Sequence, residues 1–271
     1  EQVELDEYLQ ANDKRQVEKE RGIDHLFSHY AWSGGFIWVN APGGRAKRYL
    51  PKYDRPEPLL ASVTRGRRGE FALEVAEATK LRARQLVRLN WFNREGENST
   101  LIRHLYDNQP VQVGSRHWES PNTPLITQEA TIIGVSGNSV TLKQPLLHDL
   151  RPEWTPTVTE WAHLSEVGIE DIRFEFAYDE YYAHHLEKGF NAIYLANLAH
   201  SWVRNVEFIN ADSGILTDSA ANVTIEDVRV AGRKCHYGVH CGEVYGLLAR
   251  NLQVNAEVLH SLSFNTGSRA S

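Results

Sequence analysis

Four short segments in the C-terminal part of the chain repeat one pattern of hydrophobic and polar positions. Each reads apolar, charged, Asp or Asn, apolar, charged or polar, apolar, and the segments are residues 169–174, 203–208, 225–230 and 249–254. Successive side chains of a β-strand point to opposite faces, whereas a helix would need a period of 3.6 residues. The pattern therefore predicts four equivalent strands.

The charged positions of these segments alternate in sign from one segment to the next. The first charged column reads Glu170, Arg204, Glu226 and Arg250, and the second reads Arg173, Glu207, Arg229 and Gln253. Parallel strands that stack about 4.8 Å apart bring such side chains into register. We therefore expect Glu170, Arg204, Glu226 and Arg250 to form one exposed column.

A second set of strands keeps the same offsets as the first. Ile193, Ile215, Val239 and Leu262 are separated by 22, 24 and 23 residues. Two strands that repeat together form one coil, which is the signature of a parallel β-helix. We predict an all-β fold, a parallel β-helix (solenoid) with an N-terminal helical and loop cap. One continuous core should bury Ile169, Ile193, Val203, Val206, Phe208, Ile215, Ile225, Val228, Val239, Leu252 and Leu262.

The chain before the coils is less regular. Residues 1–70 are interpreted as an N-terminal arm and loop-rich cap, with helical spacing of apolar residues near the start. Residues 71–271 are interpreted as the β-helix domain, flanked by a hairpin that turns at Gly137-Asn138. The repeat stops just where another coil should begin, so we expect a C-terminal continuation beyond Ser271.

The composition and charge of the chain argue against nucleic acid and membranes as its partners. The 271 residues are 41% hydrophobic and carry a formal net charge of −6, which suits a soluble protein with a substantial core. The absence of a basic patch argues against nucleic acid, and no apolar run is long enough to span a membrane. The two cysteines, Cys235 and Cys241, are expected to be free thiols.

Residues 86–149, 167–174 and 221–228 resemble bacterial right-handed parallel β-helix proteins of the pectate-lyase-like superfamily. The resemblance rests on the repeat pattern over roughly residues 70–271. It implies a right-handed, carbohydrate-active fold, which hosts polysaccharide lyases, glycoside hydrolases, epimerases and phage tailspikes. A polysaccharide partner and a secreted or periplasmic location are expected, and the oligomeric state is open.

The candidate site lies on the outside of the coils. With Ile193, Ile215, Val239 and Leu262 pointing inward, a column of small residues would form a shallow floor: Ala192, Gly214, Gly238 and Ser261. A polymer on this floor would meet the expected substrate-binding residues Tyr194, Asp212, Tyr237, His260 and Asn265. The alternative is that the small residues only ease a tight turn into each strand.

Residues 233–240 contain the densest group of reactive side chains. Cleavage of a uronate by β-elimination needs a cation or metal on the carboxylate, a base for the C5 proton and an acid at the leaving oxygen. Arg233 or Lys234 could provide the cation, and His236, His240 or Tyr237 the base and acid. No protein metal site is predicted, although a divalent cation such as calcium is a candidate cofactor. The alternative is a solvated polar loop.

Two further functions remain open. A glycoside hydrolase needs two carboxylates about 5 to 10 Å apart, for which Asp212, Asp218 and Glu243 are available. Asp218 is therefore included among the catalytic candidates. A non-catalytic carbohydrate-binding or tailspike-like module would have the same surface and need none of these groups. Asp171, Asn205, Asp227 and Asn251 are expected to form a structural hydrogen-bond ladder.

An insertion over residues 177–190 lengthens one coil. Its tyrosines, Tyr178, Tyr181 and Tyr182, would either stack on sugars or pack the insertion onto the helix.

Overall fold

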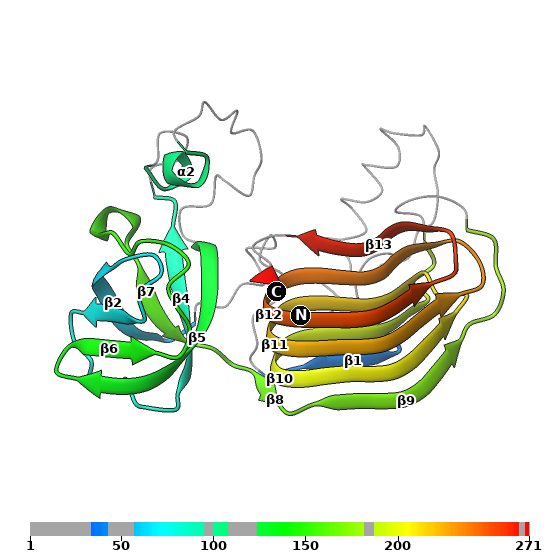
Figure 1. Ribbon diagram of the computed structural model, residues 1–271, viewed down its shortest axis with the longest axis horizontal. Coiled ribbons are helices and arrows are strands. Elements are labelled where there is room, and N and C mark those ends of the chain that lie inside the picture. The colour runs from blue at the N-terminus through cyan, green and yellow to red at the C-terminus, as the bar shows by residue number, and fades with distance from the viewer. Residues whose placement is uncertain are drawn as a thin grey trace. The chain divides into compact units, whose positions relative to one another are not determined.

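The computed structural model describes residues 34–42, 57–94, 100–107, 124–181, 187–265 and 269–270 (Figure 1). The chain divides into two compact units, one formed by Glu1–Gly44 with His163–Ser271 and the other by Arg45–Ala162. The predicted helical arm near the N-terminus lies outside the described residues. Among those described, no helix has the length and apolar character needed to cross a bilayer.

The first unit is a solenoid of stacked parallel strands. Its three long strands are β10 (Asn191–Ile209), β11 (Ser213–Ala231) and β12 (Cys235–Val254), each hydrogen-bonded to the next (Figure 1). The strands β13 (Val258–Asn265) and β14 (Arg269–Ala270) continue the stack on β12. The predicted all-β parallel β-helix is thus confirmed.

The first coil is assembled from two segments that are distant in sequence. The strands β8 (Leu164–Ser165) and β9 (Gly168–Glu175) pair with the later part of β10. The strand β1 (Ile37–Asn40) pairs with the beginning of β10. Part of the expected N-terminal cap is therefore a strand of the solenoid itself.

The coils bend where the backbone adopts a left-handed conformation at equivalent positions. One corner carries Asp171, Asn205, Asp227 and Asn251, whose φ angles are 57°, 50°, 55° and 54°. Asn and Asp tolerate this region better than other residues with a Cβ atom. The Asn205 amide donates a 2.6 Å hydrogen bond to Asp171, and the Asn251 amide donates a 2.9 Å bond to Asp227. The predicted structural ladder is confirmed.

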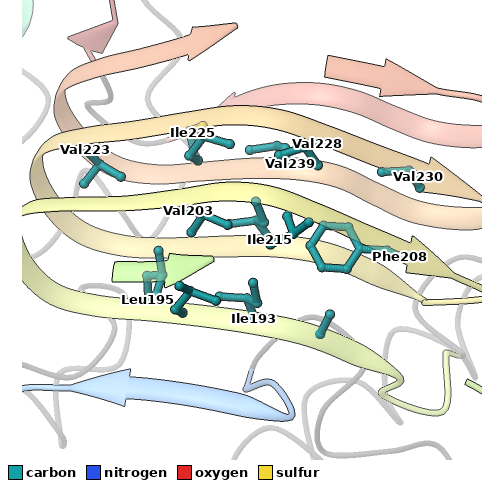
Figure 2. Close-up of a cluster of buried hydrophobic side chains, with 14 of the residues drawn as sticks. Ile193, Leu195, Val203, Phe208, Ile215, Val223, Ile225, Val228, Val230 and Val239 are labelled. Carbon is teal, nitrogen blue, oxygen red and sulfur yellow. The ribbon is translucent and has the colours of Figure 1, made fainter. Parts of the chain in front are cut away.

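The hydrophobic core runs through all coils (Figure 2). Of the eleven residues expected there, nine are buried, from Ile169 to Val239 along the chain. Leu252 is only half-buried and Leu262 is 39% exposed. Leu262 lies on β13, which ends the described sheet and has a neighbour on one side only. Leu252 lies on β12 beyond Leu247, where no later strand among the described residues pairs with it.

The charge ladder on the outside has the predicted register. Arg204 lies between Glu170 and Glu226, and Glu226 pairs in turn with Arg250. An Arg204 guanidinium nitrogen lies 2.7 Å from a Glu170 carboxylate oxygen, and Arg250 forms an ion pair with Glu226. The alternation of sign along the sequence is thus an alternation in space.

The second unit is a closed antiparallel barrel. Its strands follow the order β2 (Leu59–Gly66), β3 (Ala72–Val75), β6 (Ser139–Leu142), β5 (Pro124–Ser136), β4 (Leu86–Phe92) and β7 (Thr157–Glu160). A short helix, α2 (Thr100–Leu105), and a 3-10 turn, η3 (Pro152–Trp154), lie between its strands in the sequence.

The boundaries between the two units differ from the boundary near residue 70 that was expected from the sequence. The predicted hairpin exists as β5 and β6, with Gly137 at φ 58°, but it belongs to the barrel. Residue 70 lies between β2 and β3, which are adjacent barrel strands, so it marks no boundary between the units. Barrel and solenoid strands share the same two-residue alternation, so periodicity alone cannot separate them.

The register leads to a stability prediction. Ile225→Ala should lower the free energy of unfolding of the solenoid by about 2–5 kcal/mol, because it leaves a cavity in the core. Arg204→Ala should change it little, because the exposed ion pair it removes is screened by water. Urea denaturation of both variants tests this, and an equal loss in the two would contradict the assigned faces.

Candidate functional site

One column of side chains crosses five strands on one face of the solenoid. Register pairs place Trp38, Tyr194, Leu216, His240 and Ser263 side by side on β1, β10, β11, β12 and β13. The last four each follow one residue of the predicted inward column of Ile193, Ile215, Val239 and Leu262, and Trp38 extends the alignment by one strand. Strands about 4.8 Å apart make this column about 19 Å long.

Two aromatic rings begin the column. The Trp38 and Tyr194 rings meet edge to face, with centroids 5.3 Å apart. Trp38 is 41% exposed, whereas Tyr194 is buried and donates a 3.1 Å hydrogen bond from its hydroxyl to Asp218. Asp218 is half-buried one strand further on. Tyr194 and Asp218, which were predicted separately as a substrate-binding and a catalytic residue, are therefore brought together.

Tyr237 is surrounded by three imidazole rings. Its ring centroid lies 3.8 Å from that of His236, 4.5 Å from that of His240 and 5.2 Å from that of His260. His240 Nδ1 lies 2.8 Å from the Ser263 hydroxyl, which fixes the orientation of this imidazole. His260 is exposed, while Tyr237 and His240 are half-buried. These residues form a ring cluster that solvent reaches from the His260 side.

The column of small residues is not an open floor, which corrects the expectation from the sequence. Ala192 is buried in the hydrophobic core. A Cβ atom on Gly214 would lie 2.5 Å from the Gly238 carbonyl oxygen and 2.8 Å from the Phe208 ring. A Cβ atom on Gly238 would lie 2.5 Å from the carbonyl oxygen of Ser261. These glycines allow the backbones of successive coils to approach closely.

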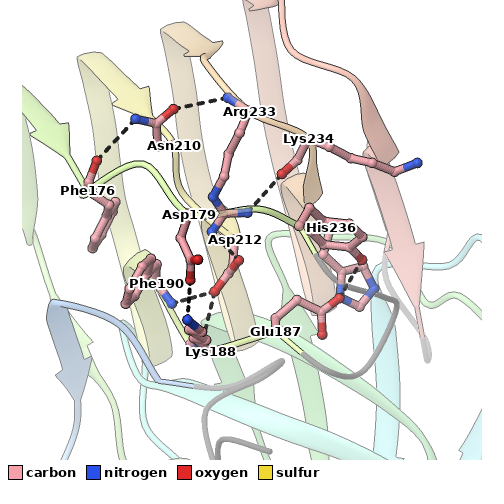
Figure 3. Close-up of polar contacts among 12 residues, drawn as sticks. Phe176, Asp179, Glu187, Lys188, Phe190, Asn210, Asp212, Arg233, Lys234 and His236 are labelled. Atoms are coloured by element: carbon pink, nitrogen blue, oxygen red, sulfur yellow. Dashed lines mark hydrogen bonds and ion pairs between the residues drawn. The ribbon is translucent and has the colours of Figure 1, made fainter.

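Arg233 and Asp212 form a buried ion pair (Figure 3). The distance from the guanidinium to the carboxylate is 2.5 Å, and the side chains are 4% and 2% exposed. Asp212 also accepts hydrogen bonds from the backbone amides of Gly189 (2.9 Å) and Phe190 (2.7 Å). Both predicted site residues therefore anchor the end of the insertion to the coils, and neither side chain is open to a substrate.

His236 forms a second buried pair with Glu187 (Figure 3). His236 Nδ1 lies 3.0 Å from a Glu187 carboxylate oxygen, which also accepts a 2.7 Å hydrogen bond from the Tyr181 hydroxyl. Burial alone would raise the pKa of Glu187, but His236 and Tyr181 together hold it below its usual value. Burial and the bond to Glu187 raise the pKa of Tyr181. His236 thus links the insertion to the ring cluster.

Lys234 lies at the edge of the coil, apart from the buried pairs. Its ammonium nitrogen is 2.5 Å from a carboxylate oxygen of Glu257, which is 73% exposed. Six residues of extended chain separate Lys234 from His240, or about 20 Å. The structure therefore does not bring the predicted lysine and histidine into one reaction centre.

Two cysteines and Asn265 remain to be placed, along with any metal site. Cys235 and Cys241 are buried and form no disulfide, and desolvation raises their thiol pKa values to about 11 and about 12. The side chain of Asn265 lies outside the described residues. Across the described ranges, no group of three or more His, Cys, Asp or Glu residues is placed to hold a metal ion.

Two residues important to this region were not predicted from the sequence, and a third was predicted with a different role. Trp38 was missed because its strand lies more than 100 residues before its partner, although residues 36–39 are all apolar or aromatic. Glu187 was missed because its role depends on burial against His236. Tyr181 was recognised only as an aromatic residue of the insertion, whereas its hydroxyl is what contacts Glu187.

Comparisons with known proteins found only solved structures that resemble this chain distantly. No protein-family model matches the chain, and neither does any curated protein. The tailspike protein of Pseudomonas phage LKA1 is 12% identical, with a TM-score of 0.44 over 79% of this chain and 33% of that one. The tailspike of Pseudomonas phage phi297 is also 12% identical, with a TM-score of 0.38 over 84% of this chain and 51% of that one.

A third solved structure is a tailspike of Acinetobacter baumannii bacteriophage AP22, in complex with A. baumannii capsular saccharide. It is 12% identical, with a TM-score of 0.34 over 74% of this chain and 34% of that one. The chain thus spans between a third and about half the length of these tailspikes. At these identities and TM-scores, the likenesses establish neither a family nor a function.

The buried pairs lead to a prediction about stability. Asp212→Asn should destabilise the solenoid by about 3–5 kcal/mol, because it leaves the buried Arg233 charge without a carboxylate. Glu257→Gln is the matched control, since it breaks an exposed pair that also contains a basic residue, and it should have little effect. Urea denaturation distinguishes the two, and a small loss for Asp212→Asn would show that Arg233 is stabilised by other means.

Proposed function

We propose that the solenoid binds a polysaccharide on the face that carries Trp38 and the ring cluster of Tyr237, His240 and His260. The observation that carries this proposal is the row of aromatic and imidazole rings across β1, β10, β12 and β13, with exposed rings at Trp38 and His260. Aromatic faces offer apolar contact area to the C–H faces of sugar rings. Three strand spacings, or about 14 Å, separate Trp38 from His240, so a ligand that contacts both is an oligosaccharide and not a single sugar.

Polar groups beside the rings suit sugar hydroxyls. Asp218 is held by the Tyr194 hydroxyl, and His240 is held by Ser263, so each presents a fixed donor or acceptor beside an aromatic surface. A few oriented polar groups on a largely apolar surface are typical of ligand sites in proteins. This combination supports recognition of a carbohydrate, whichever reaction follows.

Binding can be tested by removing the exposed ring. Trp38→Ala should weaken glycan binding by about tenfold, since a large aromatic contact contributes of the order of 1 kcal/mol or more. Phe71→Ala is the matched control, because Phe71 is 52% exposed but lies in the barrel unit. Affinity electrophoresis in gels that contain acidic or neutral polysaccharides measures both. Equal retardation of wild type and Trp38→Ala at high ionic strength, where ionic contacts are screened, would contradict the proposal.

The ring cluster contains side chains that can transfer protons, and we propose that it catalyses β-elimination of a uronate-containing polysaccharide. A base removes the C5 proton, the C4–O bond breaks, a double bond forms between C4 and C5, and an acid protonates the leaving oxygen. Tyr237 and His240 are both suited to proton transfer, and their ring centroids lie 4.5 Å apart. The exposed His260 ring lies 5.2 Å from that of Tyr237, where an imidazole N–H group would donate a hydrogen bond to the uronate carboxylate.

The geometry gives less support to a hydrolase. Asp212 is 2% exposed and is engaged by Arg233 and two backbone amides, so it is not available as an acid or a nucleophile. The carboxylates that remain for this mechanism are Asp218 and Glu243, and Glu243 follows Gly242, the register partner of Asp218. Glycoside hydrolysis remains the alternative reaction, and Asp218→Asn would abolish it.

Catalysis has a separate test from binding. His240→Ala and Tyr237→Phe should each lower the rate of unsaturated-product formation by a factor of about 10² or more. Lys234→Ala should have a small effect, because Lys234 is remote from His240 along the strand. Absorbance of the unsaturated product and release of reducing ends are followed separately on uronate polysaccharides. Reducing ends without absorbance would establish hydrolysis. If neither signal appears, the protein binds the polysaccharide without cleaving it.

A further inference from the structure

A groove on the barrel unit is lined by three cationic side chains. The groove encloses about 540 Å³, and Lys80, Arg82 and Arg84 project from the loop that joins β3 to β4. Glu160 is the one carboxylate among the lining residues, so the lining carries an excess of positive charge. This excess stands out in a chain whose formal net charge is −6.

The three cations have no carboxylate partner within the described residues. Ion pairs there neutralise many other basic residues, including the buried Arg88, but none involves Lys80, Arg82 or Arg84. Lys80 donates a 3.2 Å hydrogen bond to the backbone carbonyl of Leu59, which uses only one of its three ammonium protons. All three side chains are exposed, so their donors can reach a ligand in the groove.

The loop that carries the cations is held rigidly. Leu81 is 5% exposed and anchors it in the barrel core. The Arg84 amide donates a 2.7 Å hydrogen bond to Ile132, and the Arg82 amide donates a 3.2 Å bond to the side chain of Gln85. Arg84 has a φ of 71°, a conformation that costs energy for a residue with a Cβ atom. The backbone that carries the charges is therefore set before any ligand arrives, so the entropic cost of binding falls mainly on the three side chains.

We infer that this groove is a second binding site, which takes the carboxylate or sulfate groups of an acidic polysaccharide. Unpaired guanidinium and ammonium groups suit such anions. Thr79, Gln85 and Glu160 also line the groove and offer partners for sugar hydroxyls. The lining contains no aromatic residue, so the stacking surface on which single-stranded nucleic acids depend is missing from it. The site belongs wholly to the barrel unit, and the inference does not rest on the proposed function of the solenoid.

The test uses the full chain and a variant with three neutral substitutions, Lys80→Gln, Arg82→Gln and Arg84→Asn. Asparagine is chosen at residue 84 because it tolerates positive φ. The control variant, Arg65→Gln with Arg67→Gln, neutralises two exposed barrel arginines that do not line the groove. Circular dichroism and the melting temperature establish that each variant is folded. The single variant Arg82→Gln gives a second readout if the triple variant does not fold.

The probes are sodium polygalacturonate for carboxylates, dextran sulfate for sulfates, and neutral dextran. Wild type should bind one or both polyanions, more weakly at higher ionic strength, and should not bind dextran through this site. The triple variant should bind about tenfold more weakly, and Arg82→Gln about twofold to threefold more weakly. The control variant should retain nearly full affinity. Trp38→Ala should also retain this salt-dependent binding, which separates the groove from the solenoid face.

Three results would overturn the inference. The first is unchanged polyanion binding by the folded triple variant, or by Arg82→Gln if the triple variant does not fold. The second is an equal loss in the control variant, which would show that overall charge and not the groove is responsible. The third is tighter, groove-dependent binding of a single-stranded DNA oligonucleotide than of either acidic polysaccharide.

Discussion

Parallel pairing of β10, β11 and β12 at constant offset is the constraint on which the rest of the solenoid depends. The offset keeps Ile193, Ile215 and Val239 in one inward column across all three strands. It also places residues of similar conformation at each corner, so that left-handed φ values recur where Asn and Asp can adopt them. A single-residue shift would turn the core outward and move the corners onto residues that resist this conformation.

The same pairing converts distant parts of the chain into one surface. Trp38 reaches the column of Tyr194 and His240 only because β1 fills the place that β8 and β9 leave vacant in the first coil. The ring-lined face is thus a product of coil closure, and its polar groups are oriented by neighbours on adjacent strands. Side chains fixed in this way lose little further freedom when a ligand binds.

Buried charges give the insertion a defined attachment to the coils. Arg233 with Asp212, and His236 with Glu187, lie at the start of β12, where the insertion returns to the solenoid (Figure 3). Removing two charges from water is costly, and only close pairing with additional hydrogen bonds compensates for it. These pairs explain why several reactive residues of the segment 233–240 are not open to solvent.

The sequence by itself determined the solenoid, the stacking register, the charge ladder and the Asn–Asp ladder, because these follow from short patterns repeated at nearly constant spacing. It also identified Tyr194 and Asp218, and the group of Tyr237, His240 and His260, as neighbours on one face. Only the tertiary structure decided that Gly214 and Gly238 are packed against other coils, and that Arg233, Asp212 and His236 are buried in pairs. It also separated the barrel from the solenoid and placed Ile37–Asn40 in the first coil. The physical reason is that alternation reports the two faces of a strand, whereas burial, ion pairing and strand partners depend on contacts between residues far apart in the chain.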